Sequence, residues 1–349
     1  MSDPACVVVV APNWLGDAVM ALPAIGDVRR KFPSARLVVA ARRAVAEVFT
    51  LVPFVDERVT LQWNGRWWQW RTLAADAGRL RRLGADVVIL LPNSFAAAWL
   101  ARGAAIPARW GYGSDMRARL LSRVVRRPVA SMHQGAYYQH LTRELGIESG
   151  PLEPSVTIAD DASAIARQQL LDRGWDGVRP VVVFASGAAY GNAKRWIPSH
   201  AARVVTDLVR QRQITCVMVG SQGDAATVRE VVQAVDADAA PHVIDMTGQT
   251  TIPMLAGVLS VAGACVANDS GAMHLAAAVG TPLVALFGPT REDETAPLTR
   301  SGSRAEVLTH SVSCRPCMLR ECPIDHRCMT GIAPDRVYGA LTSLLSSTP

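Results

Sequence analysis

The sequence has little charge, few aromatic residues and no long uninterrupted apolar run. Charged residues make up 19% and aromatic residues 6% of the 349 residues, whereas hydrophobic residues make up 50%. Such a chain can bury a large apolar core, which excludes an extended disordered protein. The longest uncharged stretches, 246–268 and 270–290, are interrupted by Gly, Pro and Thr, so neither predicts a membrane-spanning helix.

The amino terminus lacks the marks of a secretory signal. Residues 1–6 contain no basic residue, and the apolar run that follows, 7–10, is short. We therefore expect a cytoplasmic protein with reduced thiols. The chain also lacks a helix-turn-helix, zinc-finger or RNA-recognition pattern, so a nucleic-acid partner is not expected.

Positive charge is concentrated in the first half of the chain. Residues 1–155 hold 20 Lys and Arg against 12 Asp and Glu, a net charge of +8, which leaves −2 for the remainder of a chain whose total is +6. This half is the candidate surface for an anionic partner. Residues 115–127 have helical patterning with arginines on one face. That pattern suits an ordinary solvated helix or a contact for anionic lipid or phosphorylated substrate.

Short β-branched runs alternate with helical stretches along the whole chain, which is the pattern of parallel sheets covered by helices. The first series has strands at 7–11, 36–40 and 86–91. A second series begins at about residue 180, after a less regular region. We predict an α/β protein with two Rossmann-like domains, residues 1–160 and 161–333, whose parallel sheets face a central cleft, followed by a closing helix and tail at 334–349.

A polar stretch follows the predicted strand 264–268 and leads directly into a helix. Backbone N–H groups at Ser270 and Gly271 are exposed at this helix start, where the helix dipole adds partial positive charge. Such a start binds phosphate. Asp269 or Ser270 can equally be a simple helix cap, and His274 an ordinary histidine of the first turn.

A second loop, 185–196, follows the first strand of the same half. It offers small residues, a hydroxyl at Ser186 and two cations, Lys194 and Arg195. Ligands of open α/β sheets bind beyond the carboxyl ends of strands, where both loops lie. Together the two loops predict a diphosphate site.

Asp17 lies between the first predicted strand and the first predicted helix, in the segment that starts at Asn13. A carboxylate in the first turn of a helix is commonly a capping acid. The functional interpretation is a general base, kept ionised by the helix dipole, that takes a proton from an acceptor hydroxyl.

The chain resembles the ADP-heptose lipopolysaccharide heptosyltransferases, and this likeness covers nearly all of it. The segments that carry the resemblance are 12–17, 194–196, 268–274 and 287–290, while 91–95 and 110–112 are more like the heptosyltransferase II branch. The resemblance implies a GT-B fold and an inverting, metal-independent transfer of heptose from ADP-L-glycero-β-D-manno-heptose to the anionic heptose–Kdo–lipid A inner core of lipopolysaccharide.

The resemblance also implies roles for individual residues. Asp17 would be the catalytic base, and Lys194 would stabilise the leaving diphosphate. Asp224 would hold the ribose, the segment 246–248 would lie against adenine, and Asp269 would orient the donor sugar. The full set of implied substrate contacts is Asn13, Gly16, Ser186, Gly187, Lys194, Trp196, Asp224, Met246, Thr247, Gly248, Asp269, Ser270, Gly271, Ala272 and His274.

The implied enzyme needs no cofactor and works as a monomer, associated peripherally with the inner face of the cytoplasmic membrane. Three alternatives stay open at this point. One is a relative with another acceptor, such as the bare inner core or a protein. The others are a sugar-nucleotide epimerase on the same fold and a non-catalytic nucleotide-sugar-binding protein.

Four of the seven cysteines lie close together in the sequence, at Cys314, Cys317, Cys322 and Cys328. Four thiolates can hold zinc or iron in a structural site, and some relatives carry such an iron site. The spacing matches no standard zinc module, and reduced packing thiols or an adventitious disulfide are the alternatives. We expect a Cys-rich loop at 314–328 with a structural metal as one hypothesis.

Overall fold

The computed structural model of the chain describes residues 3–65, 69–300 and 302–346. It consists of two compact units, the amino-terminal unit Met1–Val156 and the carboxy-terminal unit Thr157–Pro349. Each unit contains one six-stranded sheet whose strand pairs are all parallel. The α/β class predicted from the sequence is therefore confirmed. Within the described ranges, no helix has the length and apolar character needed to cross a bilayer.

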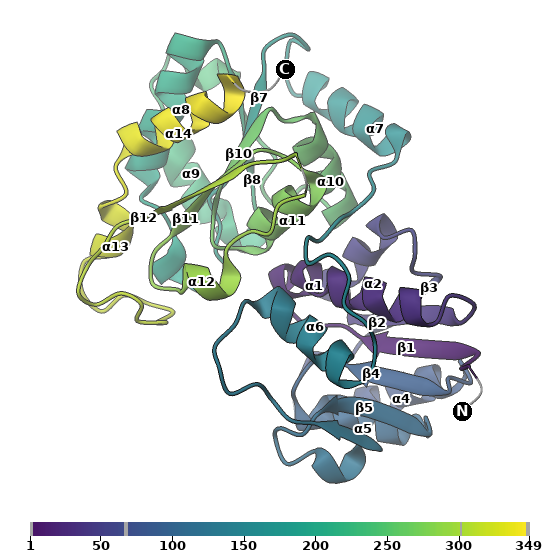
Figure 1. The fold of residues 1–349 in the computed structure, drawn as a ribbon. Helices are drawn as coiled ribbons and strands as arrows, with labels where there is room; N and C mark the ends of the chain where they lie inside the picture. The colour runs from purple at the N-terminus through teal and green to yellow at the C-terminus, as the bar shows by residue number, and fades with distance from the viewer. Residues whose placement is uncertain (1–2, 66–68, 301, 347–349) are drawn as a thin grey trace. The chain divides into compact units, whose positions relative to one another are not determined.

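The amino-terminal sheet has the strand order β3-β2-β1-β4-β5-β6. Its strands are β1 (Cys6–Val10), β2 (Arg36–Arg42), β3 (Glu57–Leu61), β4 (Val87–Leu90), β5 (Ala108–Tyr112) and β6 (Arg123–Val125). Every residue of β1 is buried, as expected for a central strand covered on both faces. One face carries α1 (Leu15–Met20), α2 (Leu22–Lys31) and α6 (Gln134–Glu144), and the other carries α4 (Trp70–Arg81) and α5 (Phe95–Gly103) (Figure 1). The short helices α3 (Arg43–Ala46), η1 (Glu47–Leu51) and η2 (Ala118–Leu120) complete the unit.

Two helix predictions in this unit were wrong. The segment 115–127 forms the single turn η2 and the edge strand β6, because Asp115 and Met116 both adopt φ near +53°, which ends a right-handed helix. The single helix expected at 17–32 is divided into two helices, α1 and α2. Pro23 lies in the first turn of α2, where its missing N–H is tolerated, but it cannot continue the hydrogen bonding of α1.

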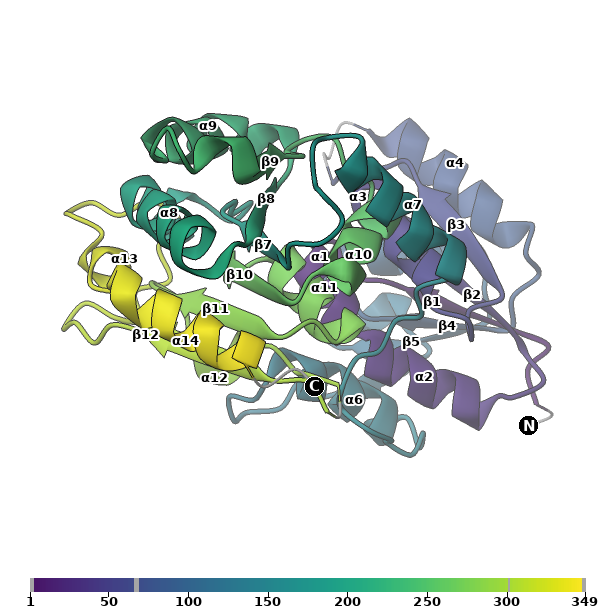
Figure 2. The same cartoon turned by 90° about the horizontal axis from the view of Figure 1, so that it is seen from above.

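The carboxy-terminal sheet has the order β12-β11-β10-β7-β8-β9. Its strands are β7 (Val181–Ala185), β8 (Thr215–Val219), β9 (Val243–Asp245), β10 (Ala264–Asn268), β11 (Leu283–Phe287) and β12 (Ala305–Thr309). The helices α8 (Pro198–Arg212), α9 (Ala225–Ala234) and α14 (Pro334–Ser346) pack together on one face, and α7 (Asp160–Leu171), α10 (Ile252–Val261) and α11 (Gly271–Val279) on the other (Figure 2). The remaining short helices are η3 (Asn192–Lys194), η4 (Gln222–Asp224), η5 (Ala240–His242), α12 (Glu292–Thr295) and α13 (Arg327–Thr330).

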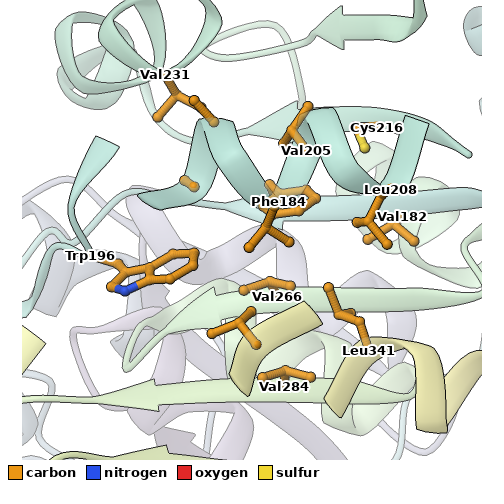
Figure 3. Close-up of a cluster of buried hydrophobic side chains, with 14 of the residues drawn as sticks. Val182, Phe184, Trp196, Val205, Leu208, Cys216, Val231, Val266, Val284 and Leu341 are labelled. Atoms are coloured by element: carbon orange, nitrogen blue, oxygen red, sulfur yellow. The ribbon is translucent and has the colours of Figure 1, made fainter. Parts of the chain in front are cut away.

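The core of this unit lies between the sheet and the α8 side. Phe184 of β7 packs among Val205 and Leu208 of α8, and Val266 lies below it on β10 (Figure 3). Burial of each such side chain stabilises the fold by about 1.5–3 kcal/mol. Trp196 closes one end of this cluster, where its indole N–H donates to the carbonyl of Ile332 at 3.0 Å. The loop that ends at Trp196 is thereby anchored in the core.

The two sheets share one topology. When the strands are numbered within each unit, both sheets have the order 3-2-1-4-5-6. From the first strand the chain adds strands 2 and 3 on one side, and then returns to add strands 4, 5 and 6 on the other side. Loops at the point between the first and fourth strands diverge and leave room for a ligand beyond the strand ends. In the amino-terminal unit these loops follow β1 and β4. In the carboxy-terminal unit they follow β7 and β10.

Candidate functional site

In the carboxy-terminal sheet the strand order reverses between β7 and β10, and we call this place the switch point. The loops that follow these two strands are joined by Asn268, the last residue of β10. Its side-chain amide donates to the carbonyl of Ser186 at 2.8 Å, and its Oδ1 accepts from the backbone N–H of Trp196 at 3.2 Å. Asn268 therefore holds both ends of the loop 186–196 against the strand that leads into α11. The sequence had marked this stretch without giving Asn268 a role.

Lys194 and Asp269 meet between these loops. The Lys194 ammonium lies 2.6 Å from Oδ2 of Asp269, and the hydroxyl of Thr290 donates to the same oxygen at 2.7 Å. Asp269 is only 6% exposed and Lys194 12% by side chain, so this is a largely buried, charge-assisted contact. The two residues that sequence reasoning placed at the donor phosphates and sugar are thus brought together, and Thr290 is an additional member.

Helix α11 begins immediately after this pair. Its N-cap residue, Ser270, makes no side-chain capping hydrogen bond, so the first N–H groups of the helix lack that partner. The simple-cap interpretation of Ser270 is therefore wrong. Gly271 and Ala272 form the first turn, and His274, one turn on, is 4% exposed. This start has the features of an anion site, because N–H groups and the helix dipole point the same way.

Asp224 ties the first loop to the loop after β8. Its carboxylate accepts hydrogen bonds from the Ser221 backbone at 2.9 Å and the Ser221 hydroxyl at 2.6 Å, and from Ala188 N–H at 3.3 Å. Arg195 lies 3.5 Å from it. A Cβ on Gly187 would come within 2.4 Å of the Asp224 carboxyl carbon, so only glycine fits there. Asp224 is 6% exposed, and its proposed contact with a ribose stays a prediction.

The predicted adenine segment follows β9. Met246 is buried and its N–H bonds to Met218 of β8, while Gly248 bonds to Gly220 at the end of β8. Gly248 has φ +72°, a conformation that favours glycine. The segment 246–248 therefore lies beside the loops already described, at the same end of the same sheet.

Three buried polar atoms around these loops have no hydrogen-bond partner in the described part of the chain: Ser270 Oγ, Thr247 Oγ1 and Arg195 Nε. A buried polar group without a partner costs about 1–3 kcal/mol. Native proteins satisfy nearly all such groups, so these atoms mark places where a polar ligand would complete the structure. All three residues lie in loops that follow strands of the carboxy-terminal sheet.

Asp17 lies at the switch point of the amino-terminal sheet, in the first turn of α1. Asn13, Gly16 and Asp17 are all partly exposed. The buried Tyr138 of α6 donates its hydroxyl to Oδ1 of Asp17 at 3.1 Å. Burial, together with the adjacent Asp17 carboxylate, raises the pKa of Tyr138 well above its ordinary value, so the phenol stays protonated and remains a donor. No sequence pattern indicated this partner, which lies 121 residues away from Asp17.

Arg117 organises the loops after β4 and β5. This fully buried arginine donates to the carbonyls of Tyr112, Pro92 and Ser94. Burial lowers the pKa of Arg117 to about 10. Beside it, the Asn93 amide donates to the hydroxyl of Tyr137 at 2.9 Å. These contacts fix the ends of β4 and β5. In the helix expected at 115–127, Arg117 falls on the apolar side, away from the other arginines.

The four clustered cysteines lie at different depths. Cys314 and Cys317 are exposed, Cys322 is intermediate, and Cys328 is buried in the core cluster. Burial raises the pKa of Cys328, and the other three thiols raise it further. Within residues 3–65, 69–300 and 302–346, no three or more His, Cys, Asp or Glu side chains are arranged to hold a metal ion. The geometry does not support the metal hypothesis.

Comparison with known proteins gives a consistent family. Residues 75–327 match glycosyltransferase family 9 (heptosyltransferase). The chain is 28% identical to lipopolysaccharide heptosyltransferase 2 of Salmonella typhimurium, over 97% of this chain and 98% of that protein. It is likewise 28% identical to lipopolysaccharide heptosyltransferase 2 of Escherichia coli K12, with the same coverage.

Solved structures give the same fold. The chain matches E. coli ADP-heptose LPS heptosyltransferase II with a TM-score of 0.84 and 27% identity, over 98% of each chain. A glycosyltransferase family 9 structure from Veillonella parvula matches with a TM-score of 0.86 at 22% identity, over 100% of this chain and 99% of that one, which shows the fold alone. The likeness extends over the full GT-B architecture that the sequence predicted.

Proposed function

Since the chain belongs to glycosyltransferase family 9, the heptosyltransferase family, we propose that it moves L-glycero-D-manno-heptose from ADP-heptose to the heptose–Kdo–lipid A inner core of lipopolysaccharide. Near full-length similarity to proteins named lipopolysaccharide heptosyltransferase 2 supports this substrate pair. One structural observation carries the proposal: a buried Lys194–Asp269 pair at the start of α11, at the switch point of the sheet.

The carboxy-terminal unit is proposed to bind the donor. Ser186, Gly187, Lys194 and the start of α11 at Ser270–Ala272 would hold the diphosphate, with His274 close by. The unpartnered hydroxyl of Ser270 supports this placement, because phosphate oxygens accept hydrogen bonds. Further contacts proposed for the donor are Asp224 on the ribose, the segment 246–248 on adenine, Asp269 on the heptose, and Trp196, whose backbone closes the loop.

The amino-terminal unit is proposed to bind the acceptor and to supply the base. Asp17 would take the proton from an acceptor hydroxyl as its oxygen forms a bond to the anomeric carbon. The bond from that carbon to the diphosphate oxygen breaks, and its electron pair leaves with ADP. Attack on the face opposite ADP inverts the anomeric centre. Asn13 and Gly16 line the same segment as Asp17.

Charge on the departing diphosphate would be stabilised by Lys194 and the N–H groups of α11. Fixed cations and N–H groups aimed at developing negative charge are effective catalysts, since they need no reorganisation during the reaction. This is the basis for proposing that transfer requires no metal ion. Thr290 fixes Asp269 and thereby the position of the ammonium.

Two further proposals concern location. The net charge of +8 on residues 1–155 suits an anionic acceptor and an anionic membrane face. Phe95 and Trp99 of α5 are 42% and 54% exposed and stack with ring centroids 6.0 Å apart, a pairing suited to the membrane interface. We propose a monomer that associates peripherally with the inner face of the cytoplasmic membrane.

A reconstituted reaction tests the proposed function. Purified protein with ADP-heptose and heptose–Kdo–lipid A should release ADP and add one heptose, with and without EDTA, and NMR should show the inverted anomeric configuration. Kdo–lipid A lacking the first heptose serves as the control acceptor and should not react. Transfer to that control alone would reassign the acceptor, and a change in ADP-heptose without acceptor would indicate an epimerase.

The hydrogen bond from Tyr138 to Asp17 predicts a pH effect. It stabilises the ionised carboxylate, so in Tyr138→Phe the acidic limb of the kcat/KM profile should move to higher pH. Activity at high pH should be retained. Tyr137→Phe is the matched control, because Tyr137 bonds to Asn93 instead. Equal profiles for both variants and the unchanged protein would contradict the assigned contact.

A further inference from the structure

The segment that contains three of the four clustered cysteines, residues 310–326 between β12 and α13, is attached to the loop 186–196. Ala193 N–H donates to the carbonyl of Arg320 at 3.0 Å, and the hydroxyl of Tyr190 donates to the carbonyl of Met318 at 2.8 Å. A Cβ on Gly191 would lie 2.2 Å from the Arg320 carbonyl oxygen, so the two backbones are in direct contact. We call residues 310–326 the Cys-rich segment.

The Cys-rich segment is also attached to the loop after β11. Met318 N–H donates to the carbonyl of Pro289 at 2.9 Å, and the Arg315 guanidinium donates to the carbonyl of Gly288 at 2.6 Å. That loop carries Thr290, which holds Asp269. The segment therefore bridges two loops that position the Lys194–Asp269 pair.

The ring of Tyr190 lies close to two cations, Lys194 and Arg320. Lys194 Nζ lies 4.6 Å from the centroid of the Tyr190 ring, and Arg320 Cζ lies 5.1 Å from the same centroid. An aromatic face attracts cations, and a guanidinium stacks on it particularly well. One ring thus gathers an ammonium from the loop 186–196 and a guanidinium from the Cys-rich segment.

The three cations near this site differ in whether they have an acidic partner. Lys194 is paired with Asp269, and Arg195 lies 3.5 Å from Asp224. Arg320, in contrast, is exposed and has no acidic partner within the described residues. Among the described residues no ion pair neutralises Arg320, whose side chain has a fork of donors that suits phosphate.

The other arginines of this region differ from Arg320 in this respect. Arg315 is paired with Glu292 at 2.6 Å, and Arg327 with Asp325 at 2.9 Å. Their charges are neutralised locally. Arg320 is thus the arginine among these three whose charge is left for a ligand.

We infer that Arg320 is a second cation for the diphosphate, acting beside Lys194 on the phosphate distal to the nucleoside, and that the Cys-rich segment is a wall of the donor site. The identity of the ligand rests on the proposed function. Tyr190 is a positioning residue in this arrangement, because it acts through Lys194 and Arg320. The segment then has a role in substrate binding that does not depend on its thiols.

Calorimetric titration of the full-length protein with ADP and with AMP tests this inference. Arg320→Met should weaken ADP binding about tenfold or more, and AMP binding much less, because AMP lacks the distal phosphate. The salt dependence of ADP binding should also become shallower. Tyr190→Leu should weaken ADP binding in the same direction, whereas Tyr190→Phe, which keeps the ring, should retain most of the affinity.

The matched control is Arg327→Met, which removes an exposed arginine that is paired with Asp325. It should leave ADP binding unchanged. Equal ADP affinities for Arg320→Met and Arg327→Met, or equal losses for ADP and AMP, would overturn the inference. Failure of the unchanged protein to bind ADP would overturn the proposed donor instead, so the two failures are distinguishable.

Discussion

Asp17→Asn should lower kcat for heptose transfer by roughly 10²–10⁴-fold, while ADP binds as tightly as to the unchanged protein. Asparagine has nearly the same size, and its side-chain oxygen can still accept the hydrogen bond from Tyr138. The substitution removes only the ability to accept a proton. Steady-state kinetics with saturating donor and acceptor, together with ADP titration, measure the two effects.

Glu148→Gln is the control for Asp17→Asn, since Glu148 is an exposed carboxylate of the same unit. Its kcat should match that of the unchanged protein. Near-normal turnover by Asp17→Asn would end the assignment of Asp17 as base. A parallel loss of ADP affinity would instead indicate a general defect in the protein.

Lys194→Met should lower kcat/KM by about 10²–10³-fold, through weaker donor binding and slower chemistry together. The Lys194 ammonium contacts Asp269 in the structure, so a loss of activity in Lys194→Met has two explanations. Either Lys194 serves the diphosphate, or it only neutralises a buried carboxylate. Removing one partner of a buried pair is itself destabilising, and thermal unfolding must be measured alongside the kinetics.

The double variant Lys194→Met with Asp269→Asn separates these explanations. If Lys194 only neutralises Asp269, the double variant should be as active as Asp269→Asn alone. If Lys194 holds the diphosphate, the double variant should regain stability but be much less active than Asp269→Asn alone, because Asp269 is itself proposed to contact the heptose. Recovery of kcat/KM in the double variant to the level of Asp269→Asn alone would remove Lys194 from the catalytic machinery.

Much of the fold was predictable because its signals are local. Runs of buried valine such as β1 and β7, followed by helical stretches, specify parallel strands with helices between them. The start of α11 was predictable for the same reason, since a polar turn leads directly from strand to helix. The class and the two-unit organisation need no knowledge of long-range contacts.

The helix wrongly predicted at 115–127 shows where local patterning fails. The spacing of arginines matched a helix, but Asp115 and Met116 adopt a left-handed conformation, which is more common for aspartate than for methionine and which the arginine spacing does not reveal. Arg117 then turns inward to three carbonyls, one at the end of β5 and two in the loop after β4. Tertiary hydrogen bonds of this kind override periodicity and leave no mark in the sequence.

The candidate site was predictable only in part. Lys194 was identified from its loop after a predicted strand, and the role of Asp269 was implied by the family resemblance, but their direct contact joins residues 75 positions apart. Asn268, Tyr138 and Arg320 also contact residues that are far from them in the sequence, so local patterns did not indicate these contacts. The Cys-rich segment was interpreted through its thiols, whereas its hydrogen bonds to the loop 186–196 come from backbone carbonyls.

The separate hydrophobic cores have a consequence for how such proteins diversify. The core cluster around Val8 and Leu90 lies wholly in the amino-terminal unit, and that around Phe184 and Leu208 wholly in the carboxy-terminal unit. Mutations that reshape the loops after β1, β4 and β5 therefore leave the interior packing of the other half intact. Natural selection can alter one recognition surface while conserving the other, so a lineage gains new specificities without having to redesign its whole interior.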